Sequence, residues 1–484
     1  MTSDYKFPHQ LREVIVNALP EDTSRHGNEP ELRFTYLPAT HAKALRPESM
    51  LVVGIRGSGK SFWWSALQKP EHRETVGKDI GLNRNTKVST GFGERPQPDD
   101  YPGKDTLTRL LVEFEARSIW RTVVLKQIGG GRLPEEFNSL NRWKDRIGWL
   151  KENPEPVEQF FYQVDNELES RQTYHLVLFD ALDRTADDWK TMNQLIRGLL
   201  QTVLDFRSSH RIRLKMFVRP DQIEDPEVAA FPDSSKMLSQ KTELYWPRIE
   251  LYGLLWQHLA NEATLGIFRE GCEKLTSVKW RNTEGVWVVP EKLRTDESMQ
   301  RRVFHAMTGP WMGRDRRRGF PYTWLPNHLG DTRNQVSPRS FLAALRHAAS
   351  EKERSEQPFA LHYENIKRGV QEASKIRVRE MQEDYPWVQT LFEPLSGISV
   401  PCHADEIKRI WKEHNVLNGL EHSIAAAAVR LPPEHIHVGS EGVLADLASL
   451  GLIERLSADR INIPDVYRVG YGIGRRGGVK PAAR

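Results

Sequence analysis

Short apolar runs alternate with amphipathic stretches between residues 50 and 260. Apolar runs that are typical of buried strands occur at 50–53 and 175–179, and a third expected strand at 213–218 is apolar except for Arg213 and Lys215. Stretches with the helical spacing of apolar positions lie between these runs, and the longest of them is 186–207. Strands that alternate with helices predict an α/β fold, in which helices flank a parallel sheet.

Weaker patterns extend the expected sheet and the helices around it. We expect further strands at 86–90 and 241–246, and a helix over 248–260. The stretch 106–126 also has helical period, with Asp105 as its expected N-cap. Two helices broken at prolines are predicted between this stretch and the apolar run at 175–179.

Changes in composition divide the chain into five regions. We expect an N-terminal extension (1–49), a core (50–260) with a helical insertion at about 95–170, a helical lid and linker (261–399), a winged-helix-like domain (400–470) and a basic flexible tail (471–484).

The winged-helix-like domain is predicted from the pattern of its last helix and the two strands that follow it. The apolar positions 443, 444, 447 and 450 form one stripe of a helix that Gly451 would cap, and two short strands follow. The C-terminal segment 468–484 contains basic residues and no acid. The basic residues are Arg468, Arg475, Arg476, Lys480 and Arg484. Such a module can contact double-stranded DNA. It can equally serve protein contact, with a tail that only aids solubility.

A glycine-rich loop follows the first apolar run directly. The sequence Gly54-Ile-Arg-Gly-Ser-Gly-Lys-Ser61 fits the pattern G-x-x-x-x-G-K-[ST] between a strand and a helix. Glycines let backbone N–H groups curl around phosphate oxygens, Lys60 adds a positive charge, and the Ser61 hydroxyl can bind Mg²⁺. The predicted phosphate-binding residues are Gly54, Arg56, Gly57, Ser58, Gly59, Lys60 and Ser61.

Two further apolar runs end in charged side chains. Asp180 follows the run at 175–179, as in a Walker B strand, where the acid would hold Mg²⁺ beside the loop. Asp183 comes three residues later and could polarise an attacking water. Arg219 ends the run at 213–218, where its charge could sense the γ-phosphate. A surface arginine at a strand end remains the alternative for Arg219.

These motifs together resemble the additional-strand P-loop NTPases, in particular the KAP and STAND groups related to AAA+ ATPases. The KAP signature has two adjacent acids, whereas this chain has Asp180-Ala181 and then Asp183-Arg184. The resemblance implies catalytic roles for Lys60, Asp183 and Arg219, and for Arg339 at the start of a lid helix. In this family a neighbouring subunit often supplies an arginine finger, for which Arg184 is a candidate.

The function that this resemblance implies is ATP binding with Mg²⁺, followed by hydrolysis or by a switch in conformation or assembly. It also implies a homo-oligomer or a protein partner, and a role in phage defence or regulation on DNA. An alternative is a DNA-binding regulator that holds ATP without hydrolysing it, as the alanine at position 181 suggests. A small-molecule kinase is a third class, which the large C-terminal module disfavours.

Composition and charge narrow the picture further. The 484 residues hold 69 Lys and Arg against 65 Asp and Glu, so the net charge is only +4, unlike that of a histone-like polycation. Two distant cysteines and the lack of a long apolar run predict a cytoplasmic protein without disulfides or membrane spans. Residues 301–318 hold six Arg and one Asp, which indicates either a nucleic-acid patch or a solvated loop.

Overall fold

The computed structural model describes residues 5–21, 30–262, 266–351, 358–426, 428–476 and 479–481. Within these ranges the chain forms two compact units. One unit is continuous and comprises residues 39–245, and the other joins residues 1–38 to residues 246–484. The expected core at 50–260 is therefore too long at its C-terminal end, because the helix α12 (Arg248–Ala260) belongs to the second unit.

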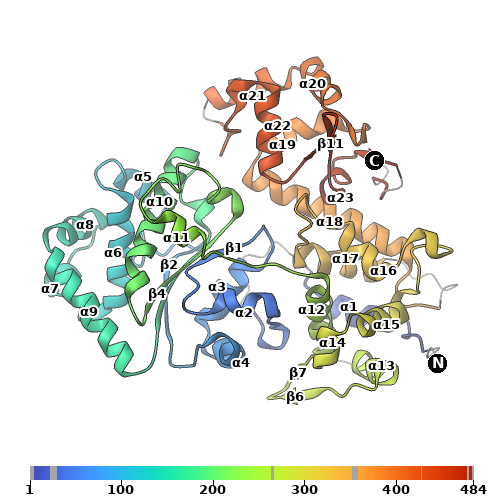
Figure 1. Ribbon diagram of the computed structural model, residues 1–484, viewed down its shortest axis with the longest axis horizontal. Helices are drawn as coiled ribbons and strands as arrows, with labels where there is room; N and C mark the ends of the chain where they lie inside the picture. Colours follow the sequence, from blue (N-terminus) through green and yellow to red (C-terminus); the bar gives the residue numbers. More distant parts are fainter. Residues whose placement is uncertain are drawn as a thin grey trace. The chain divides into compact units, whose positions relative to one another are not determined.

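A five-stranded parallel sheet forms the centre of the 39–245 unit (Figure 1). Its strands are β1 (Leu51–Val53), β2 (Lys87–Phe92), β3 (His175–Phe179), β4 (Ile212–Val218) and β5 (Thr242–Glu243). Their order in the sheet is β2-β3-β4-β1-β5. All strands predicted for the core are thus present, and they pair in parallel as the α/β pattern predicts.

Helices cover this sheet through apolar and aromatic side chains. The helix α6 (Ala116–Gly129) packs against β2 and β3 and against α10 (Trp189–Asp205). Trp120 of α6 lies edge-on to Phe92 of β2 and to Phe179 of β3, with ring centroids 5.8 Å away in both cases. Its indole N–H donates to the carbonyl of Leu195 in α10 (2.8 Å). One buried tryptophan therefore joins two strands and a neighbouring helix.

The other helices of this unit have 4 to 17 residues and include the predicted insertion. They are α2 (Ala39–Leu45), α3 (Lys60–Gln68), α4 (Pro70–Ile80), α5 (Lys104–Leu110), α7 (Glu135–Asn138), α8 (Trp143–Glu152), α9 (Pro154–Ser170) and α11 (Ser234–Leu238). The helix expected over 106–126 is wrong in its continuity, because the chain turns between α5 and α6. Asp105 lies in the first turn of α5, and Gly103 is the N-cap residue.

The second unit is mainly helical. It contains α1 (Leu11–Ala18), α12, α13 (Ile267–Thr276), α14 (Glu291–Thr295), α15 (Glu297–Thr308), α16 (Pro321–Asn327), α17 (Pro338–Ser350), α18 (Tyr363–Asp384), α19 (Trp387–Phe392) and the hairpin β6 (Arg281–Thr283) and β7 (Val286–Val288). The helix α1 packs against α17, and α17 packs along α18. Residues 5–19 are therefore part of this core, whereas the sequence predicted an N-terminal extension over 1–49.

The C-terminal part adds small sheets to this unit. The strands are β8 (Ser399–Val400), β9 (Cys402–His403), β10 (Glu454–Leu456), β11 (Arg460–Asn462) and β12 (Gly474–Arg475), and the helices are α20 (Ala404–Glu413), α21 (Val416–Ala425), α22 (Ser440–Ser449) and α23 (Asp465–Arg468). Three of the strands form an antiparallel sheet in the order β10-β11-β9.

The prediction of a flexible basic tail is wrong for the described residues after 470. Gly474 and Arg475 pair with β8, and the side chains of Ile473 and Val479 are buried. Arg468 is completely buried, where its Nε donates to Asp465 at 2.7 Å. The sequence pattern did not reveal this because Asp465, the acid that neutralises Arg468, lies before the acid-free segment 468–484. Arg484 lies outside the described residues.

Candidate functional site

The glycine-rich loop has the backbone shape that phosphate binding requires. Gly57 and Gly59 have φ values of 76° and 101°, in the left-handed region that glycine adopts most readily. A Cβ at Gly54 would lie 2.3 Å from the Ser58 hydroxyl oxygen, so a larger residue there would displace the loop. Gly59 is the N-cap residue of α3, whose positive end therefore follows the loop directly.

The side chain of Lys60 folds back onto the glycine-rich loop. Its Nζ donates to the carbonyls of Gly54 (2.7 Å) and Ile55 (2.9 Å). Removal from water lowers the pKa of Lys60 to about 8, although the nearby carboxylate of Asp180 opposes this shift. An anion seated in the loop would favour the charged amine, because it would replace the two carbonyls with full negative charges.

Ser61 and Asp180 supply the oxygen atoms that a Mg²⁺ ion prefers. Asp180 is buried at the end of β3, and its carboxylate accepts a hydrogen bond from the side chain of Ser61. Burial raises the pKa of Asp180, while the Ser61 hydrogen bond and the charge of Lys60 oppose the rise. The predicted metal ligands therefore lie together, and their donor set fits a magnesium ion.

Arg219 connects the end of β4 to the end of β3. Its guanidinium lies 3.8 Å from the carboxylate of Asp183 and 3.4 Å from that of Asp221, and its side chain is only 8% exposed. The structure thus brings Arg219 and Asp183 to the same sheet edge as Lys60 and Asp180. A surface position for Arg219, which the sequence left open, is excluded by this burial.

The order of the strands decides the fold of this unit. Strand β4 lies between β1, which leads into the loop, and β3, which ends at Asp180. The 39–245 unit has the P-loop NTPase fold. Ligands of open α/β sheets bind at the carboxyl ends of the strands, where all the groups described above are found.

Comparisons with solved structures found distant similarity along most of the chain. Similar solved structures include Cdc6p from Pyrobaculum aerophilum (11% identity, 94% of each chain, TM-score 0.29). They also include a Walker-type ATPase of Pyrococcus abyssi (12%, 91% of this chain and 99% of that chain, 0.37) and the ORC2 protein of Aeropyrum pernix in ADPNP–ADP complexes (12%, 91% and 94%, 0.36). No protein-family model and no curated protein sequence matches the chain.

The sheet edge that holds the loop at 54–61, Asp180, Asp183 and Arg219 is called the P-loop edge below. Glu94 is a further carboxylate at this edge, and sequence reasoning missed it. It follows β2, whose last residue, Phe92, accepts a hydrogen bond from the backbone N–H of Asp180 (3.1 Å). A Cβ at the intervening Gly93 would lie 2.7 Å from the ring of Trp64, so this segment runs close to α3. The signal in the sequence was a Gly-Glu pair just after the predicted strand at 86–90.

Arg184 and Arg339 both have carboxylate partners within their own units. Arg184 pairs with Glu94 at 2.5 Å, so in this chain it holds an acid of its own P-loop edge. Arg339 lies in the first turn of α17, in the second unit, and its guanidinium contacts Glu380 of α18 at 2.6 Å. The finger and lid roles of these two arginines stay predictions.

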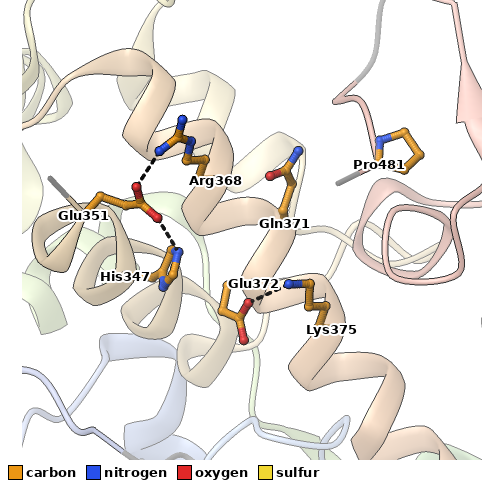
Figure 2. A pocket seen from close by; sticks show the side chains of 7 residues that line it. All are labelled: His347, Glu351, Arg368, Gln371, Glu372, Lys375 and Pro481. Atoms are coloured by element: carbon orange, nitrogen blue, oxygen red, sulfur yellow. Dashed lines mark hydrogen bonds and ion pairs between the residues drawn. The ribbon is translucent and has the colours of Figure 1, made fainter. Parts of the chain in front are cut away.

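A separate cavity of about 430 Å³ lies on the second unit, between α17, α18 and the described C-terminal residues (Figure 2). Its lining is His347, Glu351, Arg368, Gln371, Glu372, Lys375 and Pro481. The charged groups already pair with one another: Arg368 and His347 both contact Glu351 (2.6 and 3.2 Å), and Lys375 contacts Glu372 (3.1 Å). The cavity therefore offers no free charge to a phosphate.

The histidines of the C-terminal part do not gather into a zinc site. Among the described residues, His403, Asp405 and Asp459 form a group of three exposed metal-type donors. The Nδ1 atom of His403 already accepts the backbone N–H of Asp405 at the start of α20. Both cysteines are buried free thiols.

No helix in the described part of the chain is long and apolar enough to cross a membrane.

Proposed function

We propose that the 39–245 unit binds ATP together with Mg²⁺ and hydrolyses it. The observation that supports this most strongly is the convergence of the loop at 54–61, the Ser61–Asp180 pair and the Arg219–Asp183 pair at one sheet edge. The loop backbone and Lys60 would hold the phosphates, while Ser61 and Asp180 would hold the cation. Arg219 would carry positive charge toward the γ-phosphate.

Two carboxylates compete for the role of activating the attacking water. Asp183 is the candidate from the sequence, and it is held by Arg219. Glu94 is the candidate from the structure, and it is held by Arg184. Either acid could accept the proton of a water that attacks the γ-phosphate. Since position 181 is alanine, we propose that one of these neighbours supplies the missing second acid.

We further propose that nucleotide binding acts as a switch on the second unit or on assembly of the chain into a homo-oligomer. The order β9-α20-α21-α22-β10-β11, with the sheet order β10-β11-β9, supports our proposal that this module is winged-helix-like. Its third helix, α22, holds Glu441 and Asp446 but no basic residue. Both acids are paired, Glu441 with Lys408 and Arg455 and Asp446 with His435, so α22 offers no positive charge to a DNA phosphate. We therefore favour protein contact over double-stranded DNA for this module.

Phosphate release from MgATP tests the proposal, measured with and without duplex DNA. The parent protein should release phosphate, whereas Lys60→Ala should release none above background. Lys78→Ala, which changes an exposed lysine of α4, is the matched control and should behave like the parent. ATP binding without turnover under both conditions would instead favour a regulator that only holds ATP. Phosphate transfer to a small molecule would favour the kinase class.

A further inference from the structure

We propose that residues 311–320, which we call the arginine loop, bind the backbone of a single-stranded nucleic acid. The loop lies between α15 and α16 in the second unit, whereas the P-loop edge belongs to the 39–245 unit. Four of the five residues from 314 to 318 are arginines. The inference does not depend on the proposed ATP binding, and it concerns other residues than the winged-helix-like module.

The four arginines of the loop are exposed. Among the described residues, no ion pair or side-chain hydrogen bond joins Arg314, Arg316, Arg317 or Arg318 to an acid. Some exposed arginines elsewhere do have such partners, as Arg117 has in Asp205 (2.6 Å) and Arg409 has in Glu413 (2.7 Å). Asp315 itself is engaged, because its carboxylate accepts the backbone N–H of Arg317 (2.9 Å).

Hydrogen bonds hold the loop in a fixed shape. The backbone N–H of Met312 donates to the carbonyl of Gly319 (2.9 Å), which closes the loop at its base, and the Met312 side chain is buried. Arg316–Arg318 form a turn of 3₁₀ helix that Asp315 caps. Like charges that are held close together repel one another, so the arrangement is unfavourable until an anion neutralises it. A preformed loop also loses little freedom when it binds.

The chemistry of the loop fits a single strand. Each guanidinium can donate two parallel hydrogen bonds to a phosphate, and a nucleic acid offers a regular series of phosphates. Trp311 and Phe320 flank the arginines and are 39% and 40% exposed, which is unusual for large aromatic residues of this chain. Bases without a pairing partner stack on such rings, whereas the bases of a duplex are not available for stacking.

Binding of a fluorescein-labelled oligothymidine of about 20 nucleotides, followed by anisotropy at several salt concentrations, tests the proposal. The test variant is Arg314→Gln/Arg316→Gln/Arg317→Gln. The control is Arg109→Gln/Arg171→Gln/Arg207→Gln, which removes the same charge from three exposed arginines of the other unit. Since all six side chains are exposed, neither variant should lose its fold, and circular dichroism checks this.

We expect the loop variant to bind at least about tenfold more weakly than the parent, and its salt dependence to fall by about two phosphate contacts. The control should stay within about twofold of the parent. Lys60→Ala should bind the oligonucleotide like the parent, which separates this proposal from the ATP site. Equal weakening in the two triple variants would overturn the proposal, because total charge alone would then explain binding.

A second variant tests the preference for a single strand. Trp311→Ala should weaken binding of oligothymidine about fivefold and leave a duplex of the same length unaffected, since stacking needs unpaired bases. Tighter binding of the duplex than of the single strand, with no effect of Trp311→Ala, would overturn the single-strand assignment. Binding of the loop to anionic phosphatidylserine vesicles but not to the oligonucleotide would overturn the nucleic-acid assignment as a whole.

Discussion

Four acidic residues lie near the phosphate loop, and each has different contacts. Asp180 is buried and contacts Ser61, Asp183 and Asp221 flank Arg219, and Glu94 pairs with Arg184. The sequence could predict the loop and Asp180, because each follows an apolar run directly. It could not predict Glu94, because its relevance depends on the pairing of β2 with β3, which are more than 80 residues apart.

The two candidate acids can be separated by matched substitutions. Asp183→Asn and Glu94→Gln each remove one negative charge with little change in size. The variant that lacks the water-activating group should still bind ATP but turn it over about 100-fold more slowly, and the other should lose less than about tenfold. Phosphate release beside a direct binding measurement gives both values. Parent rates in both variants would show that neither acid activates the water.

The lowered pKa of Lys60 predicts that nucleotide binding depends on pH. With a pKa of about 8 in the free protein, Lys60 is partly neutral above that pH, whereas a bound phosphate favours the charged amine. Binding near pH 8.5 should therefore take up protons, and affinity should fall as pH rises from about 7.5 to about 9.5. Calorimetry in buffers of different ionisation enthalpy measures the proton uptake. Proton release on binding would contradict this pKa.

At the level of elements, Lys215 connects α2 to the sheet. This residue of β4 is completely buried, and its amine donates to the carbonyls of Ala44 (2.8 Å), Arg46 (2.9 Å) and Ser49. Lys215→Met would remove the amine from the two buried carbonyls of Ala44 and Ser49, while the carbonyl of Arg46 still accepts the backbone N–H of Ser49 (3.0 Å). We therefore expect a loss of about 3 kcal/mol in the free energy of unfolding. Urea denaturation measures this loss, and Lys78→Met is the surface control. Equal stability of the two variants would show that water replaces the amine.

The sequence predicts the bounds of helices and strands that have a strong local pattern. It does not predict to which of the two compact units each of them belongs. The sequence predicted α12 within its observed bounds, because its apolar positions continue from Leu251 to Leu259. It assigned that helix to the wrong unit, since the end of a domain depends on contacts between distant segments. The break between α5 and α6 was also missed, because the apolar spacing continues through residues 111–115 although the backbone turns there.

At the scale of the whole molecule, the switch proposal requires the two units to respond together. Saturating MgATP should slow hydrogen exchange of the loop at 54–61, because phosphate binding orders its N–H groups. If the nucleotide acts as a switch, exchange should also change in α17, which carries Arg339. Exchange changes that are confined to residues 39–245 would show that the second unit does not respond to the nucleotide.

The central claim is that Lys60 and its loop form an ATP site. Calorimetric titration of the protein with MgATP, beside Lys60→Ala and the control Lys78→Ala, tests it most directly. We predict saturable binding of about one ATP per chain in the parent and the control, and a loss of at least about 100-fold in affinity for Lys60→Ala, which removes the positive charge from the phosphates. The same affinity in Lys60→Ala as in the parent would contradict the claim.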